Sequence, residues 1–323
     1  MMYDPLLRLG LSLMSPAGAA GRLSIVIFHR IFETTDAIFP GDPDRRRFDE
    51  LCGWLAAWFR VLPLDEAVRR LAAGSLPERA LCITFDDGYA DNHDLALPVL
   101  QSHGLTATFF IATGYLDGGR MWNDTIVESI KACRADSLDL SALGLPGIGR
   151  CPLATAADRR QLVHRLLGAA KYLQQPERQA MADRVAERSG VELPDHLMMT
   201  SAQVRAMAAA GMQIGAHTVS HPILARLDDV AARREIEQGR GQLQDIVGSP
   251  VTLFAYPNGK PGTDYLPRDV DLVRSLGFEA AVSTSSGAAR HRSALAHELP
   301  RFTPWDATRL RFGLRMAANL RTG

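Results

Sequence analysis

The amino-acid sequence predicts an α/β fold with parallel strands and a helical insertion. Over the first 115 residues, short apolar, β-branched runs alternate with segments of helical periodicity. Strand-like runs return after residue 210, whereas residues 123–210 read as mostly helical. We therefore expect one α/β domain over residues 22–323 with an insertion at about 123–205, preceded by a helical segment at 1–21.

The individual elements follow from the period of the apolar residues and from Gly and Pro at their ends. Strands are expected at residues 22–31, 80–85, 106–113, 212–217, 251–257 and 278–284, and a short strand followed by a helix at 59–74. Helices are expected at 48–59, 94–104, 155–173, 176–190, 227–248 and 268–277, with a Gly/Pro-rich break at 144–152. The basic amphipathic segment 307–323 is expected to pack on the surface of the domain rather than on a membrane.

Composition excludes some classes of function. Lys plus Arg and Asp plus Glu both number 36, so no net charge draws the chain toward nucleic acid or an anionic membrane. The four cysteines form no C-x-x-C pair and are expected as buried free thiols. No run reaches the roughly 20 apolar residues that a transmembrane helix needs. These features favour a cytoplasmic protein, either free or associated with a membrane, over an exported one.

Polar side chains follow three of the predicted strands. Asp86 and Asp87 come directly after the strand at 80–85, His217 and His221 follow 212–217, and the sequence YPNG occupies 256–259. Functional residues in parallel α/β folds collect at the carboxyl ends of strands, where the loops converge. We therefore expect these groups to form one site.

The aspartates and histidines have the composition of a catalytic metal site. One carboxylate and two imidazoles leave positions on a divalent ion free for water and substrate. Two histidines four positions apart can lie on one side of a helix or turn and reach the same ion. Adjacent residues point in different directions, so one aspartate can bind the metal while the other accepts a proton from water. Helix capping by the aspartates and loop stabilisation by the histidines are the structural alternatives.

The motifs TFDDGY at 84–89 and HTVSH at 217–221 resemble those of the polysaccharide deacetylases of carbohydrate esterase family 4. The resemblance spans about 22–115 and 200–303. It implies the NodB-homology fold, an irregular (β/α) barrel of about seven strands. It also implies metal-dependent removal of N-acetyl, or less often O-acetyl, groups from sugars, with Asp86 as general base. Asp87, His217 and His221 would then hold the metal, usually Zn²⁺, with Co²⁺, Ni²⁺ or Mn²⁺ also used in the family.

The third motif departs from the family pattern F-R-P-P-Y-G. FAYPNG at 254–259 has Ala255 in place of the Arg and Asn258 in place of the Tyr. The backbone N–H of Asn258 can still contribute to an oxyanion hole, because that function needs no particular side chain. Arg301 is the candidate to replace the missing Arg and brace the base carboxylate.

The family's general acid, a histidine in a Leu-x-His motif near the C-terminus, has only an imperfect match at His297. The strand at 22–31 offers a better one, because it is apolar and carries His29 just before the strand that leads to Asp86. In a closed barrel the first and last strands are neighbours, so a strand moved to the N-terminus can occupy the same place. We therefore expect His29 to protonate the leaving amine, with a structural histidine as the alternative.

Five residues are candidates for substrate contacts: Tyr256, Asn258, Arg301, Trp122 and Asp124. Trp122 can stack on a sugar ring and Asp124 can accept hydroxyl hydrogen bonds; a core Trp beside a helix-capping Asp is the alternative. The expected substrate is an N-acetylated oligo- or polysaccharide of extracellular, capsular or cell-envelope glycan biosynthesis. Hydrolysis of a non-sugar amide or cyclic imide, and glycan binding without turnover, are the competing functions.

Overall fold

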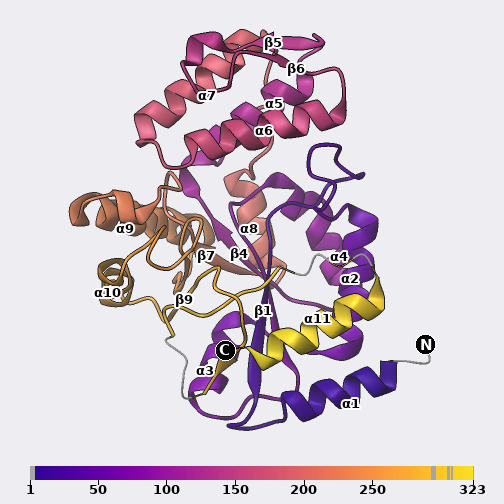
Figure 1. The fold of residues 1–323 in the computed structure, drawn as a ribbon. Coiled ribbons are helices and arrows are strands. Elements are labelled where there is room, and N and C mark those ends of the chain that lie inside the picture. The colour runs from indigo at the N-terminus through magenta and orange to yellow at the C-terminus, as the bar shows by residue number, and fades with distance from the viewer. Residues whose placement is uncertain (1–3, 292–295, 304–305, 307, 323) are drawn as a thin grey trace.

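A computed structural model describes residues 4–291, 296–303, 306 and 308–322 of the chain (Figure 1). The strands of its main sheet are β1 (Arg22–Phe28), β2 (Arg60–Val61), β3 (Ala80–Phe85), β4 (Thr108–Ile111), β7 (Gln213–Ala216), β8 (Leu253–Ala255), β9 (Ala280–Val282) and β10 (Ala289–Arg290). Their order is β10-β1-β3-β4-β7-β8-β9, with β2 paired to β3. Every pairing is parallel except that of β1 with β10.

The two ends of this curled sheet are joined by the segment 299–302. Leu299 exchanges backbone hydrogen bonds with Ala281 and Ser283 beside β9, and Phe302 exchanges them with Ile25 and Ile27 of β1. The predicted irregular α/β barrel is therefore confirmed. The same segment carries the side chain of Arg301 into the barrel, where it is 1 % exposed.

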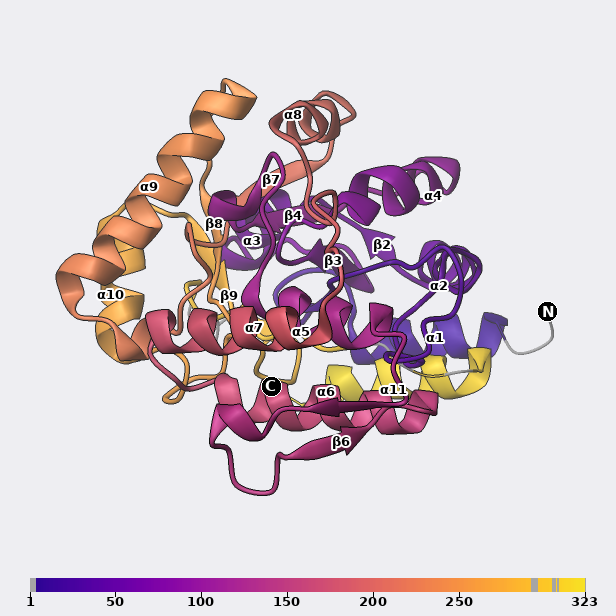
Figure 2. The same ribbon diagram turned by 90° about the horizontal axis from the view of Figure 1, so that it is seen from above.

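Helices cover the outside of the sheet. They are α1 (Asp4–Met14), α2 (Arg45–Trp58), α3 (Leu64–Ala72), α4 (Leu97–Ser102) with a π-helical turn before it (Asn92–Ala96), α8 (Ser201–Ala209), α9 (Asp229–Val247), α10 (Pro267–Ser275) and α11 (Arg309–Arg321), besides short 3₁₀ turns at Thr113–Tyr115 and Leu224–Arg226. Helix α11 lies beside α1 (Figures 1 and 2). It buries Phe312 against Trp54 and Trp58 of α2, so it packs on the barrel as the sequence predicts.

The core follows the apolar pattern of the strands. Phe85 of β3 stacks between Phe28 of β1 and Phe109 of β4, with ring centroids 5.3 and 4.7 Å apart. These rings lie on the face of the sheet that the helices cover, because Phe48 of α2 packs edge-on against both Phe28 and Phe85. Cys52, Cys82, Cys133 and Cys151 are all buried and free, which confirms the prediction of free thiols.

The residues between β4 and α8 form a separate layer at one end of the barrel, uppermost in Figure 1. Its elements are α5 (Trp122–Ala132), the antiparallel hairpin β5 (Ser137–Asp139) and β6 (Arg150–Pro152) with a 3₁₀ turn (Ser141–Leu143), α6 (Ala156–Ala170) and α7 (Gln175–Ser189). They enclose an apolar cluster of their own. The expectation of a loop break at 144–152 was wrong in part, because β6 pairs there with β5. Each of these strands has only three residues, too few to show a period of two.

None of the helices built from the described residues combines the length and the apolarity needed to span a bilayer.

Candidate active site

A cavity of about 430 Å³ lies between the carboxyl ends of the strands and the helical insertion. The strand ends contribute His29, Asp86, Asp87, His217, His221, Asn258 and Thr284, and the insertion contributes Met121, Trp122, Asn123, His164, Leu167, Gly168, Lys171 and Arg178. The structure thus brings together polar groups that follow five separate strands, as expected for a parallel α/β fold.

The two adjacent aspartates point to different partners. Asp86 accepts two hydrogen bonds of 2.7 Å from the guanidinium of Arg301. Arg301 also donates to the Thr84 hydroxyl and the Ser283 carbonyl, which fixes its orientation. Burial would raise the pKa of Asp86, but the guanidinium outweighs it and holds the pKa below its ordinary value. Asp86 is therefore an anion at neutral pH.

Asp87 instead faces two imidazoles. Its Oδ1 lies 3.5 Å from Nε2 of His217 and 3.3 Å from Nε2 of His221. This oxygen is buried and, within the described part of the chain, has no hydrogen-bond partner. The ligand atoms of all three side chains lie within 4.8 Å of one another. A buried carboxylate oxygen without a donor is costly, and a bound cation would satisfy it.

The donor set fits a divalent metal ion. Nδ1 of His217 lies 2.7 Å from the carbonyl oxygen of Ala255, and an N–H there leaves Nε2 free to bind an ion. Burial lowers the pKa of His221 to about 3, so this imidazole is neutral at physiological pH. Two neutral imidazoles and one carboxylate suit Zn²⁺ and related ions. Burial lowers the pKa of His217, yet the neighbouring aspartates outweigh it and the net shift is upward while no cation is bound.

The backbone around these groups is unusual. Asp87, Thr218, His221 and Asn258 all have positive φ, between 50° and 78°. Such conformations cost energy in residues other than Gly and cluster at functional sites. Gly88 has φ of 91°, and a Cβ there would lie 2.9 Å from Cγ2 of Ile111, so no larger residue fits the turn after the aspartates.

Glu235 of α9 holds the loop between the two histidines, and sequence reasoning missed it. Its carboxylate accepts hydrogen bonds from the backbone N–H groups of Val219 and Ser220 at 3.0 and 2.8 Å and from the Ser220 hydroxyl at 2.7 Å. The Thr218 hydroxyl also accepts from the His221 N–H. The histidines are therefore placed by a loop rather than a helix, and no local sequence signal marks the glutamate that fixes it.

The structure separates the two candidates for the general acid. His29 directly follows β1 and lines the cavity together with both aspartates. His297 is absent from the cavity lining, and its Nε2 lies 2.8 Å from the Phe278 carbonyl oxygen. Of the two histidines, only His29 is placed where it could reach a substrate in the cavity.

The candidate substrate contacts are only partly brought together. Asn258 lines the cavity, and no described group accepts a hydrogen bond from its backbone N–H. Trp122 lines it as well. Arg301 lies behind Asp86 and does not reach the lining, which corrects its assignment as a substrate contact and agrees with the bracing role.

Tyr256 and Asp124 also do not line the cavity. The Tyr256 ring is buried against Tyr265, with centroids 3.9 Å apart, and its hydroxyl donates to the His297 carbonyl. Asp124 is 4 % exposed and accepts a hydrogen bond from the Tyr89 hydroxyl. Both residues therefore point into the protein, and their assignment as substrate contacts is corrected.

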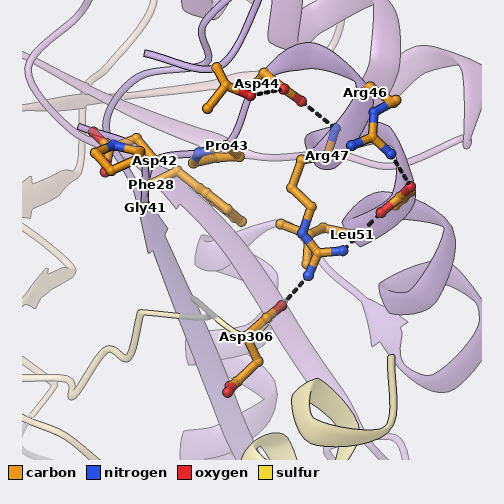
Figure 3. Close-up of a pocket in the computed structure, with 12 residues that line it drawn as sticks. Phe28, Gly41, Asp42, Pro43, Asp44, Arg46, Arg47, Leu51 and Asp306 are labelled. Atoms are coloured by element: carbon orange, nitrogen blue, oxygen red, sulfur yellow. Dashed lines mark hydrogen bonds and ion pairs between the residues drawn. The ribbon is translucent and has the colours of Figure 1, made fainter. Parts of the chain in front are cut away.

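A second cavity, of about 490 Å³, lies beside α2 (Figure 3). Several of its polar groups are paired with one another. Asp44 accepts from Thr35 and from the Arg47 backbone, and Arg46 and Arg47 both donate to Glu50. Among the described residues, its lining holds no cluster of three metal-ligating side chains like that of Asp87, His217 and His221, so we place the functional site in the first cavity.

Comparisons with known proteins agree with this site. The sequence model of the family described as polysaccharide deacetylase matches residues 73–139 and 170–281, more than half of the chain. YxkH of Bacillus subtilis, a candidate polysaccharide deacetylase, is 21 % identical over 270 residues; the match covers 83 % of this chain and 66 % of that protein, slightly less than two thirds.

Solved structures show the same fold. The Streptococcus pyogenes deacetylase PplD, in complex with acetate, superposes with a TM-score of 0.60 at 17 % identity, covering 92 % of this chain and 98 % of that one. IcaB from Ammonifex degensii has a TM-score of 0.56 at 19 % identity, covering 95 % and 99 %. Taken with the family match over both halves of the barrel, these similarities show that the chain belongs to the polysaccharide deacetylase family.

Proposed function

We propose that the protein is a metal-dependent hydrolase that removes N-acetyl groups, or O-acetyl groups, from a saccharide. The observation that carries this proposal is the different environment of the two aspartates. Asp86 is held as an anion by Arg301, while the unpartnered oxygen of Asp87 faces His217 and His221. Such a pair provides one carboxylate for a metal and another for moving a proton.

Asp87, His217 and His221 would hold the ion, most simply Zn²⁺. When bound, it lowers the pKa of a water molecule toward neutrality and polarises the acetyl carbonyl. Asp86 accepts the proton of the attacking water, because it remains ionised and is fixed by Arg301 beside the three ligands. The backbone N–H of Asn258 donates a hydrogen bond to the developing oxyanion.

His29 then donates a proton to the nitrogen of the leaving amine, and acetate is released. This role is supported by its position in the lining of the cavity that also holds the two aspartates. For an O-acetyl substrate the same proton would go to the sugar oxygen. Trp122 lines the insertion side of the cavity, where the edge of its buried ring would contact the sugar.

The proposal is tested by measuring acetate release from N-acetylglucosamine oligosaccharides with metal-loaded protein. The expected result is release by the wild type and a loss of about 10²-fold or more in the Asp86→Asn variant. Absence of acetate release from glycans, together with hydrolysis of a cyclic imide, would assign the site to a non-sugar amide instead.

For the biological role we propose only a class of pathway. Because the matched family is described by polysaccharide substrates, we propose that the reaction belongs to the biosynthesis of an extracellular or cell-envelope glycan. The predicted cytoplasmic location is tested by cell fractionation with an antibody against the protein.

A further inference from the structure

Arg178 of α7 is a buried cation that lines the catalytic cavity. Only 4 % of the residue is exposed, and its Cζ lies 5.0 Å from the ring centroid of Trp122. It is also close enough to His221 for its charge to help lower the pKa of that imidazole. The guanidinium therefore lies at the wall that the insertion contributes, near the proposed metal ligands.

No carboxylate neutralises this guanidinium. Across the described residues, the side chain of Arg178 has no hydrogen-bond or ion-pair partner. The other buried arginines of the described segments are paired, Arg301 with Asp86 and Arg79 with Glu78. Burial lowers the pKa of Arg178, as expected for a charge that has lost water without gaining an anion.

The contact with Trp122 is too weak to offset this burial. A cation–π interaction stabilises a buried cation by less than the loss of hydration costs an unpaired charge. Buried charges in proteins are paired or bind ligands. A side chain that is disfavoured for folding and faces a cavity is best explained by an anion that arrives with the ligand.

A second cation lines the same side of the cavity as Arg178. Lys171, at the end of α6, lines the same wall, and it too makes no ion pair with any described residue. Of the two carboxylates in the lining, Asp86 is paired with Arg301, and Asp87 faces the proposed cation site beside the histidines. Two cations without counter-charges create a local positive potential that favours an anionic ligand.

We propose that the saccharide substrate is anionic, and that its carboxylate or phosphate pairs with Arg178 while Lys171 supports the same group. This inference rests on the proposed deacetylase function and names its substrate class. The planar guanidinium can bind either anion with two parallel hydrogen bonds. Trp122 is packed against Arg178 and would contact the sugar residue next to the one that carries the carboxylate or phosphate.

The test compares three N-acetylated substrates of similar size: a neutral N-acetylglucosamine tetrasaccharide, a tetrasaccharide that alternates N-acetylglucosamine with glucuronic acid, and a phosphorylated N-acetylglucosamine oligosaccharide. We expect the wild type to have a KM at least about 10-fold lower for one of the two anionic substrates. Comparing the carboxylate with the phosphate identifies which anion the site takes.

The Arg178→Gln variant should raise the KM of the preferred anionic substrate by about 10–100-fold, with little change for the neutral one. Arg178→Lys should raise the KM less than Arg178→Gln does, because lysine keeps the positive charge but cannot donate two parallel hydrogen bonds. Arg184→Gln is the matched control, since Arg184 is exposed on the same helix. Arg178→Gln should also unfold at a higher temperature than the wild type, which excludes misfolding as the cause.

Equal KM values for neutral and anionic substrates, or an equal effect of Arg178→Gln on both, would overturn the inference. Calorimetry of the same saccharides binding to the Asp86→Asn variant tests the substrate preference separately from the proposed deacetylase activity. If no substrate releases acetate but the anionic saccharide still binds more tightly through Arg178, the activity is wrong and the binding preference stands. If neutral and anionic saccharides bind equally, the preference is wrong.

Discussion

Arg301 and Asp86 lie 215 positions apart in the sequence and form a two-point ion pair, with both contacts at 2.7 Å. Arg301 comes from the segment that joins the two ends of the sheet, and Asp86 follows the central strand β3. The closure of the barrel and the ionisation of the proposed base therefore depend on the same side chain. We propose that this ion pair compensates for Ala255, which stands where the family pattern has its arginine.

Replacing Arg301 with Gln should impair both stability and activity. The change leaves the carboxylate of Asp86 buried without its counter-charge, which typically costs about 3–5 kcal/mol of unfolding free energy. It should also raise the pKa of Asp86 and lower kcat, while the metal ligands remain in place. Denaturant unfolding, acetate release and metal content of the purified variant measure the three effects.

Arg79→Gln serves as the control for Arg301, because Arg79 is equally buried but lies away from the cavity and pairs with Glu78. It should lose stability and keep the kcat of the folded fraction. A folded Arg301→Gln protein with wild-type kcat would show that the ion pair only stabilises the barrel.

His29→Gln should lower kcat for N-acetyl substrates by about 10²–10⁴-fold, the usual contribution of a general acid. His297→Gln should have little effect on kcat, because that side chain lies outside the cavity and contacts the Phe278 carbonyl. An ester with a good leaving group, such as 4-nitrophenyl acetate, needs no proton and should be hydrolysed almost normally by His29→Gln. Loss of both activities, or a crippling effect of His297→Gln alone, would contradict the assignment.

Asp124 should make stability decrease as pH rises. Burial raises the pKa of this carboxyl to about 7, against about 3.9 in an unfolded chain. The folded state therefore binds more protons between these values, and unfolding free energy falls from about pH 4 to pH 7, by up to roughly 4 kcal/mol. Asp124→Asn keeps an acceptor for the Tyr89 hydroxyl but has no charge, so it should be the more stable protein at pH 8. Denaturant unfolding at pH 5 and pH 8 checks this; an equal decline in both proteins would exclude Asp124 as the cause.

Glu235→Ala should weaken metal binding although the residue is not a proposed ligand. Its carboxylate holds the backbone of Val219 and Ser220, between the two histidines. Loss of a group that orients metal ligands lowers affinity by about 10–100-fold. Competition with a chromophoric chelator measures the affinity. Glu237→Ala, on the exposed face of the same helix, should behave as the wild type; if Glu235→Ala does so too, the loop is fixed by other contacts.

Much of this arrangement could be predicted from the sequence, for physical reasons that differ between elements. The strand that leads to Asp86 is an almost continuous apolar run that is buried throughout, and the shorter strand that leads to His217 is buried at its carboxyl end. Their ends place polar groups together without any tertiary information. His29 was also predictable, since a strand that ends in histidine next to β3 must bring it to the same edge of the sheet.

Other features depend on contacts that the sequence does not encode locally. Strand β10 has two residues, and each strand of the β5–β6 hairpin has three, so neither shows a period. Arg178 and Glu235 look like ordinary helical charges, and only the packing of α7 and α9 against the strand ends gives them their roles. Tyr256 was misplaced because the residue that follows a strand can turn either into the cavity or into the core.

The direct test of the central claim is metal titration of the chelator-treated protein with acetate release as the readout. We predict that the metal-free protein is inactive, that one equivalent of Zn²⁺ per chain restores activity, and that His217→Ala and His221→Ala abolish the tight binding. Full activity of the metal-free protein, or restored activity in a variant that no longer binds the ion, would contradict the account.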